Sequence, residues 1–225
     1  MPLQIAPYLE QRGRWPAQGR HILAQHDDDL VVVYQAYRPS IGHYAAQHGH
    51  FGGEYSFSRM SWIKPNFLWM MYRSGWGTKP DQEVTLALHL RRDGFETLLA
   101  QAVPSSYSPE HYVSIAAWKE ALQASDVRLQ WDPDHDPAGQ RVARRAVQLG
   151  LRGHTLQLLN NEWLVAVTDI SDFVTVQRQH IGTLEHLQIP LERPFQPKDE
   201  RTAAWLGMDT AAAGGISSVQ SATLD

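Results

Sequence analysis

Apolar residues recur along the chain in two patterns, and the first of these predicts strands. The clearest strand is residues 30–37, where β-branched and aromatic residues form an almost continuous apolar run. Apolar and polar residues alternate over 82–90, as they do on a strand with one buried face. Residues 127–131 and 163–170 have a similar composition. We therefore expect at least four strands.

The second pattern, apolar residues three and four positions apart, predicts helices. Pro39 and Pro65 each suit a first helical turn, whereas Gly49 and Gly75 suit helix ends. The predicted helices are 39–48, 65–73, 95–102, 109–124, 138–149 and 171–180. These elements mix without the regular alternation of parallel α/β proteins. The pattern predicts an α+β fold around a mixed or antiparallel sheet.

The two ends of the chain differ from its middle. Prolines and glycines are dense in residues 1–28, so we expect an irregular leader there. Prolines and charges dominate from Leu191 on, and the last residues are small, so we expect residues 196–225 to form an extended, mostly disordered and mobile tail. Residues 29–195 are then expected to form a single α+β domain, large enough for its own hydrophobic core.

Composition narrows the setting of this domain. The chain has 225 residues, 43% of them apolar and 20% charged, with a formal net charge of −4. No global positive field draws it to nucleic acid or anionic lipid. Cysteine is absent, which excludes disulfides and thiolate chemistry and fits a reducing compartment. Because the sequence shows neither a secretory signal nor an apolar run of bilayer length, we expect a soluble cytoplasmic protein without membrane partners. The sequence carries no signal for an oligomeric state.

Residues 59–79 combine aromatic side chains with cations and form the strongest candidate binding segment. Aromatic rings can stack on a flat base, while cations and the N–H groups at a helix start can bind phosphate. The stacking candidates are Trp69 and Tyr72, together with Tyr37 from outside this segment, and the phosphate-binding candidates are Arg59, Lys64 and Arg73. Trp76 and Lys79 complete the predicted cofactor-binding residues. The alternative is that the rings fill the core while the cations extend into water. Both interpretations stay open at this point.

A second candidate centre is the acidic stretch 130–137. Asp132, Asp134 and Asp136 stand at alternate positions, as they would in a calcium-binding loop. Pro137 stands where such a loop has its glycine, however, and no glutamate completes the motif, so we expect no metal site. Asp132 directly follows the predicted strand 127–131, at a place where catalytic carboxylates often lie. It is our candidate carboxylate, with turn capping as the alternative role.

Polar residues near other elements complete the set of candidates. Gln35 and Tyr37 lie at the end of strand 30–37, where they could line a cleft, although Gln35 could also face solvent. The three arginines of the predicted helix 138–149 could meet phosphates, but a solvated face is the commoner explanation for such a stripe; they are Arg141, Arg144 and Arg145.

Four segments of the chain are typical of one protein family. They are residues 34–37 (Tyr-Gln-Ala-Tyr), residues 59–76 with three tryptophans, residues 130–133 (Gln-Trp-Asp-Pro) and residues 148–150 (Gln-Leu-Gly). Over about residues 20–180 the chain resembles the family catalogued as domain of unknown function 4291, found in bacteria and fungi. This resemblance by itself implies no particular activity.

A more distant similarity is to the ADP-ribosyltransferase superfold. Its members begin with a strand that carries a Tyr-His or Arg motif, continue with a helix ending in glycine, and carry a late Gln/Glu-x-Glu. Here the corresponding segments are 34–35, 41–49 and 130–132. Gln35 stands in place of His or Arg, and Asp132 in place of Glu. The similarity implies an enzyme that uses NAD to transfer an ADP-ribosyl group.

Together these features predict a nucleotide-binding enzyme that transfers a glycosyl-type group, with NAD as its expected ligand. Asp132 would stabilise the positive charge that develops at ribose C1′, with Gln35 and Tyr37 in the same cleft. One alternative is a non-catalytic module that binds single-stranded nucleic acid through residues 59–79, and nucleic acid could also be an acceptor. Another is that this segment is only core. If the cations of residues 59–79 and Asp132 line the same cleft, the enzyme is the favoured interpretation.

Overall fold

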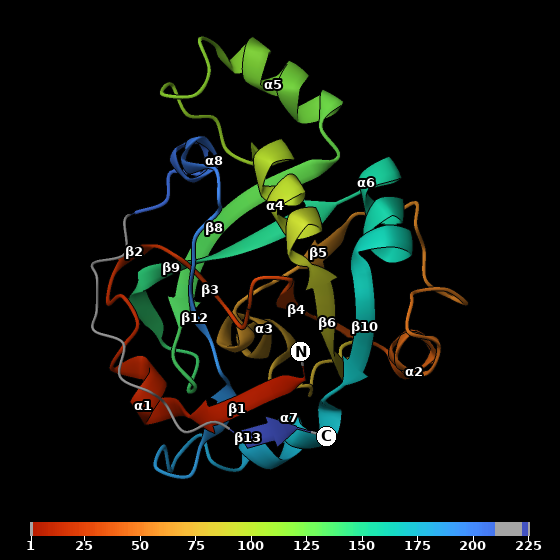
Figure 1. The fold of residues 1–225 in the computed structure, drawn as a ribbon, viewed down its shortest axis with the longest axis vertical. Helices are drawn as coiled ribbons and strands as arrows, with labels where there is room; N and C mark the ends of the chain where they lie inside the picture. Colours follow the sequence, from red (N-terminus) through yellow and green to blue (C-terminus); the bar gives the residue numbers. More distant parts are fainter. Residues whose placement is uncertain (1, 210–221, 225) are drawn as a thin grey trace.

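The computed structural model describes residues 2–209 and 222–224, in which helices and strands are interspersed (Figure 1). A three-stranded antiparallel sheet has the order β10-β6-β4. Its strands are β4 (Leu30–Tyr37), β6 (Val84–Arg91) and β10 (Leu164–Asp169). Both faces of β4 are covered, since Val31 and Val33 join one hydrophobic cluster while Val32 and Tyr34 join another. Burial on both faces explains why the run is apolar throughout rather than alternating.

The second sheet is mixed and is built around the long hairpin of β8 (Val127–His135) and β9 (Arg141–Leu151). On β9, β5 (Ser61–Ile63) pairs antiparallel and β2 (Gly19–Arg20) pairs parallel. On β8, β7 (Val103–Pro104) pairs parallel. The prediction of an α+β fold with mixed or antiparallel sheets is therefore confirmed.

Strand β9 replaces the basic helix predicted for residues 138–149, and that prediction was wrong. In the turn that precedes β9, Gly139 N–H donates to the Asp136 carbonyl oxygen, and Gly139 adopts φ +82°, which glycine does without strain. The apolar spacing of this stretch suits a helix or a strand, and β8 decides between them by offering a row of hydrogen-bond partners. Because β8 continues to His135, Asp132 lies within a strand rather than after its end.

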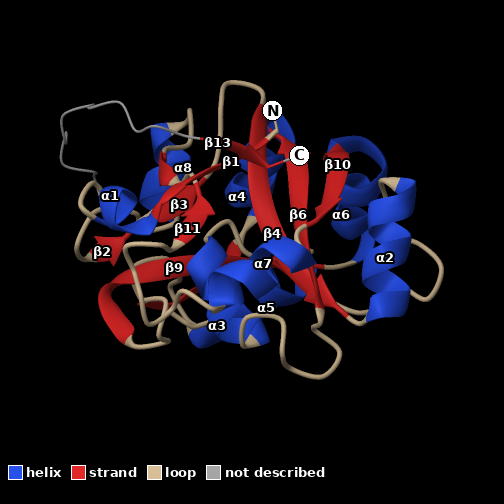
Figure 2. Cartoon of the chain, turned by 90° about the horizontal axis from the view of Figure 1, so that it is seen from below, coloured by secondary structure: helices blue, strands red, loops and turns tan. Residues whose placement is uncertain are grey.

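Helices lie around and between the sheets. Their bounds are α1 Tyr8–Arg12, α2 Pro39–His48, α3 Phe67–Ser74, α4 Arg92–Gln101, α5 Ile115–Ala124, α6 Gly153–Leu158, α7 Ser171–Arg178 and α8 Glu200–Trp205, and a π-helical turn, Leu159–Trp163, follows α6. The expected helix 109–124 starts later, at Ile115, because the Ser114 hydroxyl accepts a hydrogen bond from Ala117 N–H and caps it there. Helix α3 packs on both β4 and β8, and so joins the two sheets described above. Figure 2 shows α3 beside β9, the partner strand of β8.

The first 28 residues are not the irregular leader that their prolines and glycines predict. Strand β1 (Leu3–Pro7) pairs with β11 (Gln188–Pro190), and β3 (Ile22–Ala24) pairs with β12 (Arg193–Phe195). Trp15 is buried with the second hydrophobic cluster. The breakers separate short elements, as Pro7 does between β1 and α1, instead of preventing them.

The C-terminal segment also holds more structure than the disordered tail expected over 196–225. Helix α8 is capped by Asp199 and followed by the buried Leu206. Trp205 anchors this helix, since its indole N–H donates to the Ala102 carbonyl oxygen at 2.7 Å. Strand β13 (Ala222–Leu224) pairs with β1. The rest of the expected tail, residues 210–221 and 225, lies outside the described residues. Within the described part of the chain, no helix is long and apolar enough to cross a bilayer.

Candidate functional site

The candidate binding segment lies at the junction of the two sheets. Strand β5 pairs with β9 in the mixed sheet, and the next residue, Lys64, is joined to β4 of the antiparallel sheet. Lys64 N–H donates to the Tyr34 carbonyl oxygen at 3.1 Å, and Tyr34 N–H donates to the Lys64 carbonyl oxygen at 2.7 Å. These bonds bring the end of β4, strand β5 and the middle of β8 together, although they are far apart in sequence.

Two cavities open at this junction and share the side chains of Trp62 and Lys64. The smaller, about 350 Å³, is named here the Asp132 cavity, and it is lined by Trp62, Lys64, Trp69, Arg73, Gln130, Asp132 and Gln148. The larger, about 540 Å³, is named the Gln35 cavity, and its lining includes Gln35, Tyr37, Tyr55, Arg59, Ser61, Trp62 and Lys64. The structure thus brings the predicted residues Lys64, Trp69, Arg73 and Asp132 together in one cavity, and Gln35, Tyr37 and Arg59 in the adjoining one.

The Asp132 carboxylate is held by two glutamines of the β8–β9 hairpin. Gln130 stands directly opposite Gln148 in the register of the two strands. Gln130 Nε2 donates to Asp132 Oδ1 at 2.9 Å, and Gln148 Nε2 donates to Asp132 Oδ2 at 2.7 Å. Both partners are neutral amides, so they orient the carboxylate without cancelling its charge. A fixed anionic group therefore faces a cavity that also contains two cations.

Lys64 is buried between the cavities, with only 6% of its surface exposed. Its Nζ donates to the Trp62 carbonyl oxygen at 3.4 Å, a long hydrogen bond. The pKa of Lys64 is lowered to about 8, mainly by burial and also by the neighbouring charge of Arg73, while the charge of Asp132 opposes both. Arg73 is exposed, and among the described residues its guanidinium forms no ion pair. The cations of the cavity are therefore not neutralised by salt bridges within the described part of the protein.

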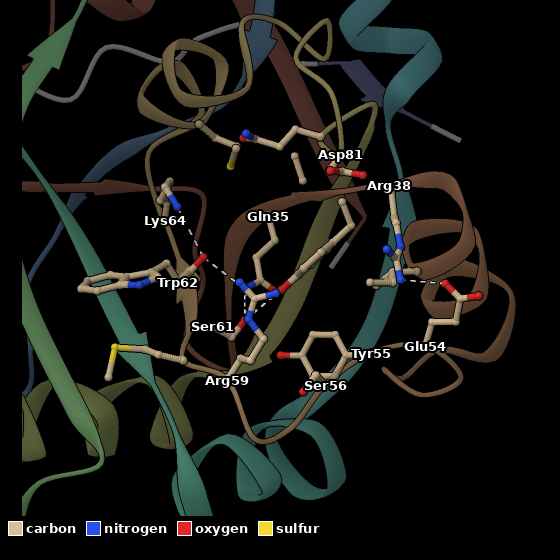
Figure 3. A pocket seen from close by; sticks show the side chains of 16 residues that line it. Gln35, Arg38, Glu54, Tyr55, Ser56, Arg59, Ser61, Trp62, Lys64 and Asp81 are labelled. Carbon is tan, nitrogen blue, oxygen red and sulfur yellow. Dashed lines mark hydrogen bonds and ion pairs between the residues drawn. The ribbon is translucent and has the colours of Figure 1, made fainter.

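A hydroxyl and amide network forms the floor of the Gln35 cavity (Figure 3). Gln35 Nε2 donates to Ser61 Oγ at 2.7 Å and to the Trp62 carbonyl oxygen at 3.1 Å. Tyr37 Oη lies 2.8 Å from the same Ser61 Oγ. Gln35 is buried rather than facing solvent, which settles the alternative left open for it. Burial raises the pKa of the Tyr37 phenol well above its ordinary value, so this hydroxyl stays neutral.

The N-terminus of α3 is occupied by protein groups, contrary to the expectation that its N–H groups would bind phosphate. The Glu192 carboxyl group accepts from Phe67 N–H at 2.6 Å and from Asn66 Nδ2 at 3.3 Å. Asn66 Oδ1 accepts from Trp69 N–H at 2.7 Å. Burial raises the pKa of Glu192 well above its ordinary value. A ligand phosphate in the Asp132 cavity would therefore have to be bound by side chains.

Three of the predicted binding residues are not among the residues that line the two cavities. Trp76 is 7% exposed, packs edge-on against Phe67 in the second hydrophobic cluster, and donates its indole N–H to the Pro137 carbonyl oxygen. Lys79 Nζ donates to the carbonyl oxygens of Tyr72 and Arg73, which caps the end of α3. Tyr72 lies outside the lining, 39% exposed, and is stacked on the His135 ring with 3.6 Å between centroids. For Trp76, the interpretation as core is the one the structure bears out.

Sequence reasoning missed Ser61, Trp62, Gln130 and Gln148 as site residues. A strand prediction for residues 141–151 would have placed Gln148 beside Gln130, and with it the carboxylate clamp. The error over β9 also concealed the role of Arg144. This side chain is not on a solvated face; it is 7% exposed, and its Nε donates to Asp134 at 2.8 Å.

Comparison with known proteins identifies a family but assigns no activity to the chain. No curated protein matches the chain. The family described as Domain of unknown function (DUF4291) matches residues 21–195, which include β4, the segment 59–79 and the whole β8–β9 hairpin. The matched segment thus contains all the residues of both cavities. Since this match spans most of the sequence, the chain belongs to the DUF4291 family.

Proposed function

We propose that the protein is an enzyme that binds a nucleotide and transfers a glycosyl-type group from it. The observation that carries the proposal is the Asp132 carboxylate, fixed by two amides in a cavity that also holds Lys64 and Arg73. A segment used only as core would not gather opposite charges around an open space. A simple groove for polyanions would not place a carboxylate among its cations, because the carboxylate repels phosphate.

Each part of the cavity suits one part of a nucleotide. Lys64 and Arg73 can bind phosphate oxygens, and Trp62 and Trp69 supply aromatic walls for a base or a nicotinamide ring. Asp132 would then lie near the ribose, where its charge stabilises the oxocarbenium-like transition state as the bond from C1′ to the base breaks. The chain's cations and rings therefore fit NAD, and we propose NAD-dependent ADP-ribosyl transfer as the reaction.

The Gln35 cavity adds groups that recognise hydroxyls. Gln35, Tyr37 and Ser61 are linked by hydrogen bonds and hold one another in position. Their remaining donors and acceptors suit the hydroxyls of a ribose, and Arg59 suits a second phosphate or an anionic acceptor. The cysteine-free composition is consistent with the cytoplasm as the place of this reaction.

The test is release of free nicotinamide from NAD, followed by chromatography, for the wild type and for Asp132→Asn. Asparagine keeps the shape of the side chain but removes its charge. We expect the rate to fall by about 10²-fold or more, because one such electrostatic contact contributes roughly 3 kcal/mol in the transition state. Asp172→Asn, at an exposed carboxylate in the first turn of α7, is the matched control and should leave the rate unchanged. Equal rates for wild type and Asp132→Asn would overturn the proposal.

A second candidate is binding of single-stranded nucleic acid, favoured by the exposed ring of Tyr72. One face of this ring lies against the buried His135 ring, and Lys79 Nζ lies 5.9 Å from the Tyr72 centroid. Exposed aromatic rings beside cations stack unpaired bases with little sequence preference. Fluorescence anisotropy with short oligonucleotides separates the candidates. Salt-dependent binding that Tyr72→Ala abolishes and Asp132→Asn leaves intact would favour the nucleic-acid module.

A further inference from the structure

Lys64 is the one lysine of the four in the sequence that the fold buries. The other three, Lys79, Lys119 and Lys198, are exposed. The Lys64 backbone is fixed by its two hydrogen bonds with Tyr34, and the next residue is Pro65, so the side chain starts from a rigid position. Its side chain lines both cavities, and Figure 3 shows it at the edge of the Gln35 cavity, with its amine directed toward the Trp62 carbonyl oxygen. The geometry thus presents one amine, and only one lysine amine, to whatever occupies the cavities.

This amine lacks the partner that a buried ammonium group usually has. Among the described residues, no carboxylate lies within ion-pair distance of Nζ, and its bond to the Trp62 carbonyl oxygen is 3.4 Å long. The charged groups that act on it are Arg73 of α3, which disfavours the ammonium form, and Asp132 of β8, which favours it. Arg59 and Asp81 line the adjoining cavity. A buried charge without a close partner destabilises the fold, so stability does not explain the lysine.

We propose that Lys64 is a nucleophile, whose amine attacks ribose C1′ and carries the ribosyl group as a covalent lysine adduct. The inference rests on the proposed glycosyl transfer and names a step within it. The Nζ lone pair forms the bond to C1′, while the bond from C1′ to the departing base breaks and its electron pair leaves with the base. Nζ then gives up a proton to the Asp132 carboxylate, the one carboxylate that lines the same cavity. In a second step an acceptor nucleophile forms a bond to C1′ while the bond from C1′ to Nζ breaks, and Nζ takes its proton back from Asp132. The Asp132 carboxylate then accepts the acceptor's proton and releases it to solvent.

The chemistry of the cavity suits each part of this step. The neutral amine is the reactive form, and the lowered pKa of Lys64, about 8, leaves roughly a tenth of the side chain neutral at pH 7. Desolvation and a cationic neighbour, here Arg73, are the two recognised means of activating a lysine. The charge of Asp132 stabilises C1′ while neither bond is complete. A lysine used only to bind phosphate would not need this depressed basicity.

The first experiment measures the nucleophilicity of the amine without any turnover. Pyridoxal 5′-phosphate, a flat anionic aldehyde, forms an imine with a neutral amine by losing water, and borohydride then reduces the imine to a stable amine. Peptide mapping after brief labelling at pH 7.5 reports the occupancy of all four lysines in one sample. We expect Lys64 to be labelled roughly ten times more than Lys79, Lys119 or Lys198, with NAD protecting it. Labelling of Lys64 no greater than that of the exposed lysines would overturn the proposal.

The second experiment looks for the adduct with the donor itself. After incubation with NAD and acid quenching, intact-mass and peptide analysis should find ADP-ribose on Lys64 in the wild type. Lys64→Arg keeps the charge but has no nucleophilic amine, and Lys64→Met removes both; neither should carry the adduct at the variant position. Wild-type nicotinamide release that persists unchanged in Lys64→Arg, with no adduct on Lys64, overturns the nucleophile while leaving the proposed function intact. Absence of both NAD binding and nicotinamide release in the wild type would overturn the proposed function as well.

Discussion

Asp132 and Asp134 lie two residues apart on β8, yet their surroundings are opposite in kind. Asp134 is 1% exposed and accepts from Arg144 Nε at 2.8 Å, and Arg144 also donates to the Pro16 carbonyl oxygen and lies over the Trp15 ring. Asp132 accepts hydrogen bonds only from the neutral amides of two glutamines. The cations of its cavity have no carboxylate within ion-pair distance among the described residues. Charge that is satisfied within the fold ties the N-terminal segment to the hairpin. Charge that is left unsatisfied around a cavity is available to a ligand.

The largest effect should come from breaking the satisfied pair. Arg144→Met leaves the Asp134 carboxylate buried without its partner, so we expect the free energy of unfolding to fall by about 3–5 kcal/mol. Urea denaturation of the wild type and the variant measures this directly. The matched control is Arg201→Met, at a solvent-exposed pair with Asp199, which should leave the free energy of unfolding nearly unchanged. Similar small losses for both variants would show that the buried pair does not hold the N-terminal segment.

Removing the unsatisfied charge of Lys64 should raise stability instead of lowering it. Lys64→Met keeps an apolar chain of similar length and removes a buried ammonium without a close partner, so we expect the free energy of unfolding to rise by about 1–3 kcal/mol at pH 7. Lys119→Met, at an exposed lysine of α5, is the control and should change little. A loss of stability in Lys64→Met would mean that the ammonium group is a structural element after all.

The pH dependence of that gain sharpens the prediction. The pKa of Lys64 is lowered in the folded protein from 10.5 to about 8, so between these values the unfolded chain binds the proton more tightly than the folded one. Stability of the wild type therefore rises with pH across this window, relative to a protein without the lysine. The advantage of Lys64→Met should be full below pH 8 and shrink toward pH 10.5. An advantage that stays constant across pH would contradict the lowered pKa.

The smallest effects should separate two neighbouring cations of the segment 59–79. Arg73→Ala removes an exposed side chain that forms no ion pair with any described residue, so stability should change by less than about 0.5 kcal/mol while nucleotide affinity falls about five-fold or more. Lys79→Ala removes a cap from α3, which should cost roughly 0.5–1 kcal/mol and leave affinity unchanged. Melting curves and calorimetric titration with ADP-ribose give both quantities. Equal effects of the two variants on affinity would place the ligand nearer to the end of α3 than the cavity.

Some of this could be predicted from sequence because local preference and tertiary contacts agree. Strand β4 and helix α2 begin and end where the pattern predicts. The apolar run favours only a strand for β4, and Pro39 at the start and Gly49 after the end favour only a helix for α2. Strand β9 was predicted as a helix because its pairing with β8 is a tertiary contact that spacing does not reveal. The short elements of the N-terminal segment depend in the same way on partners far along the chain, such as β11 and β12.

The site was predictable as a collection of residue types but not as a geometry. The density of rings and cations pointed to the segment 59–79, and the structure places Lys64, Trp69 and Arg73 of this segment at an open cavity. The same density could not show that Trp76 and Lys79 lie outside the cavities. A residue that follows α3 can fill the core, as Trp76 does, or cap the helix, as Lys79 does, as easily as it can line a cavity. The Gln148 clamp on Asp132 depended on the hairpin register, which was not predicted.

The most direct test of the central claim is a crystal structure of the protein with ADP-ribose. The account predicts density in the Asp132 cavity, with a ribose beside the Asp132 carboxylate and phosphate oxygens within hydrogen-bond distance of Lys64 or Arg73. ADP-ribose bound elsewhere on the molecule, with the Asp132 cavity left free of it at saturating concentration, would contradict the claim that this unsatisfied charge forms a nucleotide site.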